Sequence, residues 1–90
     1  MNYVEQARHR LAGELAPSVP DTELVDLYTL LVLVKGGAVT LEDVHDAWAV
    51  WTSQRWPGHR SLIPFDQLSQ EVQGLDRRYA EAIAAAAKED

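Results

Sequence analysis

Apolar residues recur every three or four positions through most of this chain, and proline or glycine interrupts the pattern at three places. The interruptions are Pro17 with Pro20, the pair Gly36-Gly37, and Pro57-Gly58. Proline breaks a helix interior, and glycine is typical of helix ends. The sequence therefore predicts an all-α fold, a compact bundle of about four helices with a structured Pro/Gly loop before the last one.

The predicted helices cover residues 2–15, 22–35, 40–55 and 70–88. Asp21, Thr40 and Ser69 are suitable caps for the last three. β-branched residues at 32 and 34 leave a short strand at the end of the second helix as an alternative. In the last helix the inward stripe is predicted to be Val72, Leu75, Tyr79, Ile83 and Ala86. Its alanine-rich end, residues 84–87, is expected to fray or to pack against a partner.

A length of 90 residues indicates one domain, 1–90, made of a helical lead (1–40) and a helix-loop-helix (41–88). The net charge of −6 argues against a general nucleic-acid binder and against a basic membrane-surface helix. The absence of cysteine excludes disulfides, cysteine-ligated zinc, iron–sulfur clusters and a thiol nucleophile. No secretory signal or membrane-length apolar stretch is found, so a cytoplasmic location is expected.

The acidic charge is not evenly distributed, because residues 47–65 contain no Asp or Glu. This stretch is rich in aromatic and cationic side chains. Indole rings can stack on a base, and arginine can donate to a phosphate. The candidate ligand-binding residues are His45, Trp48, Trp51, Arg55, Trp56, His59 and Arg60.

Each candidate also has a purely structural interpretation. Trp48 is favoured as a core residue, Trp51 is balanced between core and ligand, and the histidines are favoured as loop anchors. Trp56 is the preferred stacking residue, and Arg60, with no acidic neighbour in sequence, is the preferred anion contact.

Catalysis finds little support in the sequence. The three histidines lack the spacing of a metal-binding motif, the serines lack a nucleophile-elbow context, and there is no glycine-rich phosphate loop. We expect no enzyme activity, no metal and no cofactor.

Several residues occur in an order that resembles the RyR domain, the small helical repeat of ryanodine receptors that also occurs in bacterial and phage proteins. The matching residues are Val44-His45-Asp46-Ala47-Trp48-Ala49, Trp56, His59 to Leu68, Glu71 and Asp76-Arg77. The match extends from Leu41 to Ile83. The chain also resembles short RyR-like proteins of actinobacterial phages. Arg60 stands where the family pattern has proline.

The resemblance implies a module that binds or sequesters an anionic nucleotide-derived signalling molecule, of the ADP-ribose or cyclic nucleotide class. RyR repeats occur in pairs, so a homodimer or higher homo-oligomer is implied, in the host cytoplasm if the protein is phage-encoded. The alternative is an accessory factor that binds a host or self partner through its helical surface. DNA recognition is disfavoured, because the helix at 40–55 begins with acidic residues.

Overall fold

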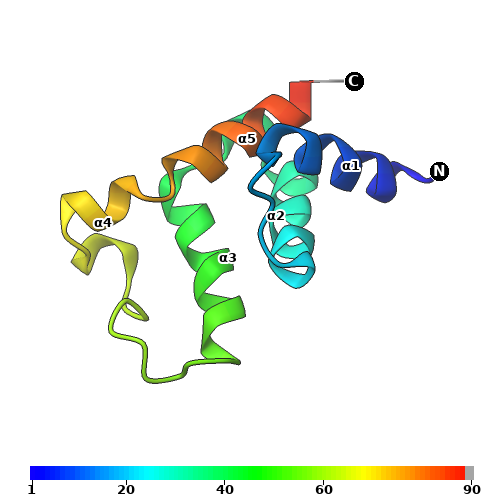
Figure 1. Cartoon of the computed structure of the whole chain (residues 1–90). Helices are drawn as coiled ribbons and strands as arrows, with labels where there is room; N and C mark the ends of the chain where they lie inside the picture. Colours follow the sequence, from blue (N-terminus) through cyan, green and yellow to red (C-terminus); the bar gives the residue numbers. More distant parts are fainter. Residues whose placement is uncertain (89–90) are drawn as a thin grey trace.

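Five α-helices follow one another in a computed structural model that describes residues 1–88 (Figure 1). They are α1 (Tyr3–Leu15), α2 (Thr22–Val34), α3 (Leu41–Ser53), α4 (Gln70–Gly74) and α5 (Arg77–Lys88). Two short 3₁₀ turns, Gly36–Ala38 and Phe65–Gln67, precede α3 and α4. The predicted all-α bundle is confirmed. The alternative strand is wrong, since helical hydrogen bonds continue to the end of α2. Residues 89 and 90 of the expected domain lie outside the described residues.

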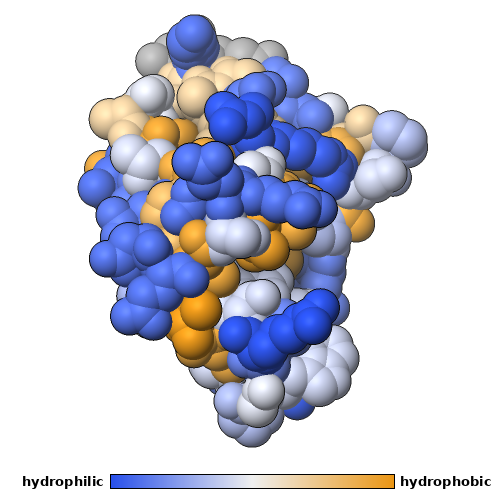
Figure 2. All heavy atoms as spheres, turned by 90° about the vertical axis from the view of Figure 1, so that its left-hand side faces the viewer, coloured by the Kyte–Doolittle hydropathy of each residue, from blue (hydrophilic) through white to orange (hydrophobic). Residues whose placement is uncertain are grey.

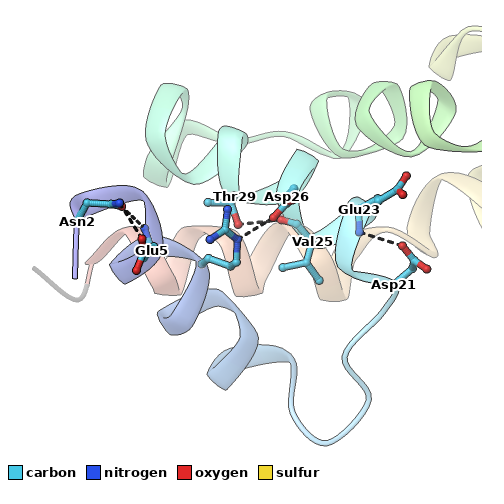
Figure 3. A network of polar contacts seen from close by, with 8 residues as sticks. Asn2, Glu5, Asp21, Glu23, Val25, Asp26 and Thr29 are labelled. Carbon is cyan, nitrogen blue, oxygen red and sulfur yellow. Dashed lines mark hydrogen bonds and ion pairs between the residues drawn. The ribbon is translucent and has the colours of Figure 1, made fainter.

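Side-chain caps fix where the helices begin, and the predicted caps are confirmed. The Asp21 carboxylate accepts from the Glu23 backbone N–H at 2.9 Å (Figure 3). Thr40 forms a reciprocal capping box with Asp43, and Ser69 caps α4. Burial acts to raise the pKa of Asp43, but the hydrogen bonds from Thr40 and the nearby Lys35 ammonium lower it overall.

The core lies where α1, α2, α3 and α5 meet. In Figure 1, α2 and α3 run alongside each other, and α1 and α5 lie across them. The buried hydrophobic residues come from all four helices and are Ala7, Leu11, Leu15, Leu24, Val25, Tyr28, Val32, Val44, Ala82, Ile83 and Ala86. Both the first forty residues and the rest of the chain therefore contribute to one cluster.

The alanine-rich end of α5 is part of this core rather than a frayed tail. Ala86 is fully buried, and its carbonyl accepts a hydrogen bond from Arg10 Nε at 3.0 Å. Ala87 packs against Gly36, which has a φ of 55°. The expectation of fraying is wrong, because small side chains let α5 approach its own neighbours closely, and the expectation that this segment packs against a partner stays a prediction.

Long-range polar contacts join α1 to its neighbours. Arg8 forms an ion pair with Asp26 of α2, which is labelled in Figure 3. Arg78 of α5 donates to the carbonyls of Leu15 and Ser18, at 2.8 and 2.7 Å. Leu15 is the last residue of α1 and Ser18 lies in the turn after it, where the carbonyls at a helix end need partners outside the helix. Arg78 thus stabilises the end of α1.

The last predicted helix is divided into α4 and α5. The N–H of Leu75 bonds to the carbonyl of Val72, three residues back, and the chain turns before α5 begins. Gly74 stands at this break and is the residue with the lowest helix propensity in the segment. The turn leaves Leu75 68% exposed, so its predicted place in the inward stripe is wrong.

The side of the molecule that carries α4 and the loop before it has a mixed surface, with hydrophobic residues exposed between hydrophilic ones (Figure 2). Ile63 and Leu75 are among its exposed large hydrophobic residues. None of the helices within residues 1–88 is long and apolar enough to cross a bilayer.

A matched pair of substitutions tests the division of the last helix. Ile83→Ala should lower the free energy of unfolding by about 2–5 kcal/mol, since it leaves a cavity in the core. Leu75→Ala should change it by less than about 0.5 kcal/mol. Urea unfolding followed by circular dichroism measures both. A similar decrease in the free energy of unfolding for the two variants would show that Leu75 is packed in the core, contrary to a break at Gly74.

Candidate functional site

A cavity of about 430 Å³ lies between α2, α3, the loop at 54–69 and the junction of α4 with α5. Its size falls within the range of about 300–1,000 Å³ that is typical of small-ligand pockets. Aromatic rings form much of its wall. The lining residues are Leu24, Tyr28, His45, Trp48, His59, Ser61, Val72, Leu75, Asp76 and Tyr79.

His45 joins α3 to the loop at one side of the cavity. Its ring is nearly fully buried, and its Nε2 lies 2.8 Å from the Ile63 carbonyl oxygen. Because a carbonyl can only accept, Nε2 carries the proton. The same ring stacks on Trp48, with centroids 5.6 Å apart, and lies 6.1 Å from the Phe65 ring. His45 therefore holds the loop against α3, which was its favoured structural role.

Trp48 and His59 form the part of the wall nearest the loop. Their rings meet edge to face at 5.1 Å. His59 Nδ1 accepts a hydrogen bond from the Ser61 backbone N–H at 3.0 Å, so the donor of a neutral ring is Nε2. The loop thus presents an exposed imidazole beside a half-buried indole face.

Tyr28 is among the residues around the cavity but is itself 0% exposed. Its ring lies 5.2 Å from the ring of Tyr79. Within residues 1–88, its buried hydroxyl has no hydrogen-bond partner; Trp51 Nε1 and Thr52 Oγ1 share this property but do not line the cavity. Burial raises the pKa of Tyr28, and the charge of Asp76 raises it further, so the hydroxyl keeps its proton.

Asp76 brings a carboxylate to this largely apolar wall. Burial raises its pKa, and the nearby His45 acts in the opposite direction. No lysine or arginine lines the cavity. The wall therefore combines aromatic side chains with one carboxylate, a set suited to a ring that donates hydrogen bonds.

A second aromatic cluster lies further along α3, outside the cavity. The Arg55 guanidinium lies 4.3 Å from the centre of the Trp51 ring, and Trp56 meets Trp51 at 6.1 Å. Arg55 also forms an ion pair with Glu23 of α2. Its charge is therefore already compensated within the protein.

A family model described as a domain of unknown function, DUF7701, matches residues 2–88. The chain belongs to the DUF7701 family. No curated protein and no solved structure matches it.

The DUF7701 match overturns the resemblance to the RyR domain, because the family that covers the chain is a different one. The residues that carried the resemblance were mostly apolar anchors at helical spacing. In the structure His45 and Trp48 pack on the loop and on each other, which explains their spacing without a shared ancestry. The DUF7701 match also includes the first two helices, which lay outside that resemblance.

The predicted site residues separate into groups in this DUF7701 chain. His45, Trp48 and His59 line the cavity. Trp51, Arg55 and Trp56 form the second cluster, in which Trp56 is 58% exposed. Arg60 lies on the exposed loop next to His59, and the structure gives it no hydrogen bond or ion pair within residues 1–88. The structure thus does not assemble all seven into one pocket.

Tyr28 and Asp76 lie at the cavity but were not among the predicted site residues. Tyr28 belongs to a segment that is apolar on nearly all sides, so it reads as a core residue. Its hydroxyl was the one sequence feature that set it apart from the aliphatic residues around it. Asp76 was named only as part of the Asp76-Arg77 pair in the resemblance to the RyR domain. The break at Gly74, which places Asp76 at the cavity, was the missed signal.

The raised pKa of Asp76 makes a pH-dependent prediction. Ionisation is harder in the folded state than in the unfolded chain, so this carboxyl favours folding below its ordinary pKa of 3.8, and the advantage is lost as pH rises. Asp76→Asn should therefore raise Tm relative to the wild type at about pH 7, and the difference should shrink at about pH 3.

Thermal unfolding at the two pH values measures this effect. Asp66→Asn removes the same charge from an exposed position and serves as the control. A lower Tm for Asp76→Asn at neutral pH would show that the carboxylate stabilises the fold, contrary to the prediction.

Proposed function

We propose that this DUF7701 chain is a non-enzymatic module that binds a small ligand, with a flat heterocyclic part of the ligand inside the cavity. The observation that carries the proposal is the union, in one cavity of about 430 Å³, of aromatic side chains with the Asp76 carboxylate, which no ion pair or side-chain hydrogen bond engages within residues 1–88. A buried polar group without a partner is costly unless something pairs with it.

A nucleotide-derived molecule suits this arrangement. Its base would lie against Trp48 and Tyr79, where aromatic faces favour stacking. Its anionic end would lie at the mouth, near His59 and Arg60, since the carboxylate of Asp76 disfavours a phosphate inside. Arg55, which the sequence offered as an anion contact, is not used because Glu23 pairs with it.

The proposal concerns binding and not catalysis. Ser61 is a potential nucleophile in the cavity wall, and its contact with His59 is through its backbone N–H rather than its hydroxyl. That geometry does not activate the serine oxygen.

Calorimetric titration with ADP-ribose, its cyclic forms and cyclic dinucleotides tests the proposal. Trp48→Leu should weaken binding about tenfold, because base–aromatic stacking is worth about 1–3 kcal/mol. Trp56→Leu, which removes an indole outside the cavity, is the matched control and should change the affinity less than about twofold.

Two results would contradict the proposal. One is that none of these compounds binds the wild-type chain. The other is that binding depends on Trp56 rather than Trp48, which would indicate that the ligand binds at the cluster of Trp51, Arg55 and Trp56.

A second candidate function, docking on a host or self partner, has its own support. Leu30, Leu33 and Val34 are exposed and lie on one face of α2, at i, i+3 and i+4. Exposed apolar patches often mark interaction sites. A homodimer through this face is the simplest form of the proposal.

Light scattering after size-exclusion chromatography tests this second candidate. The wild type should elute as a dimer, and the double variant Leu30→Glu with Leu33→Glu should elute as a monomer with unchanged helicity. A monomeric wild type at high concentration would count against self-association.

A further inference from the structure

We infer that Asp76 is the recognition group of the cavity and that it takes the amidine edge of a ligand, meaning two N–H groups attached to one carbon. This inference rests on the proposed function, because it names the chemistry of the ligand's buried part. A planar edge with two parallel donors matches the two oxygens of a carboxylate, which bind it in a bidentate manner.

The Asp76 carboxylate is free for such a role. Within residues 1–88, no ion pair or side-chain hydrogen bond engages it, although the residue is half-buried. It stands directly before α5, where an aspartate commonly caps a helix. Here the first-turn N–H groups of Tyr79 and Ala80 bond to the main-chain carbonyl of Asp76 instead. Helix capping therefore does not account for the carboxylate.

The charge around the cavity favours a donor and disfavours an anion. Arg77 and Arg78 follow Asp76 in sequence, but neither lines the cavity. Arg78 donates to the Leu15 carbonyl at the end of α1 and to the Tyr79 hydroxyl, with its guanidinium 5.0 Å from the centre of the Tyr79 ring. The groups of possible positive charge in the wall are His45, which donates to the Ile63 carbonyl, and the exposed His59. An unpaired carboxylate in this setting is stabilised by a ligand that donates to it.

The aromatic walls select for a planar group. Trp48 and Tyr79 line the cavity together with Asp76. A planar, N–H-rich group can stack on such rings while its edge faces the carboxylate, whereas a compact ammonium cannot do both.

Two ligand classes carry this edge. In guanine, N1–H and the exocyclic amine form a neutral amidine edge beside a carbonyl oxygen. In a guanidinium compound the edge is cationic. Both would use Asp76 in the same way, so the experiment has one arm for each.

Calorimetric titration of the full chain compares guanosine with inosine, which lacks the exocyclic amine, and agmatine with putrescine, which lacks the guanidinium. We expect the first member of at least one pair to bind about tenfold more tightly than the second, the value of a charge-assisted hydrogen bond. In Asp76→Asn this preference should disappear, while Asp66→Asn should retain it. Circular dichroism checks that both variants are folded.

The outcomes separate the inference from the proposed function. Equal affinity within both pairs, or a preference that survives in Asp76→Asn, overturns the role of Asp76 even if ADP-ribose still binds in a Trp48-dependent manner. If neither these compounds nor the nucleotide panel binds, the proposed function fails and the inference fails with it. A preference only in the agmatine pair supports the role of Asp76 and assigns the cavity to an organic cation.

Discussion

The packing of α1 against α5 is the contact on which the rest of the structure depends, because it joins the two ends of the chain over α2. One core cluster contains fully buried residues from both helices, Ala7 and Leu11 on α1 and Ile83 and Ala86 on α5. Arg10 and Arg78 reinforce the pairing by donating to main-chain carbonyls of the opposite helix or of the turn after it. With α5 fixed in this way, its beginning must lie over α2 and α3, and this position closes the cavity.

The distribution of charge in space differs from its distribution along the chain. Residues 47–65 contain no acidic residue, yet the fold brings two acidic side chains from other helices next to residues of this stretch. Glu23 pairs with Arg55, and Asp76 joins Trp48 and His59 in the cavity wall. Coulomb interactions depend on distance and burial, not on sequence separation. The sequence suggested that residues 47–65 could bind an anion. In the structure the positive charge of Arg55 is compensated by Glu23, and the cavity wall contains the carboxylate of Asp76.

The cavity holds polar groups that do little for stability. Burial raises the pKa of Asp76 and of Tyr28, and within the described residues the Tyr28 hydroxyl has no partner. Groups with perturbed pKa values are enriched at functional sites, and this supports the proposal of a ligand at the cavity. The neighbouring His45, in contrast, is fully engaged with the Ile63 carbonyl and serves to hold the loop.

Local chemistry was enough to determine the helical class, the breaks at proline and glycine, and the caps at Asp21, Thr40 and Ser69, because each depends on residues within one turn. Only the tertiary structure decided that the alanine-rich end is buried, that the last helix breaks near Gly74, and that Tyr28 meets Asp76. These outcomes depend on which helix faces another across more than forty residues. Periodicity gives each helix an inward face, but it does not say which partner that face will meet.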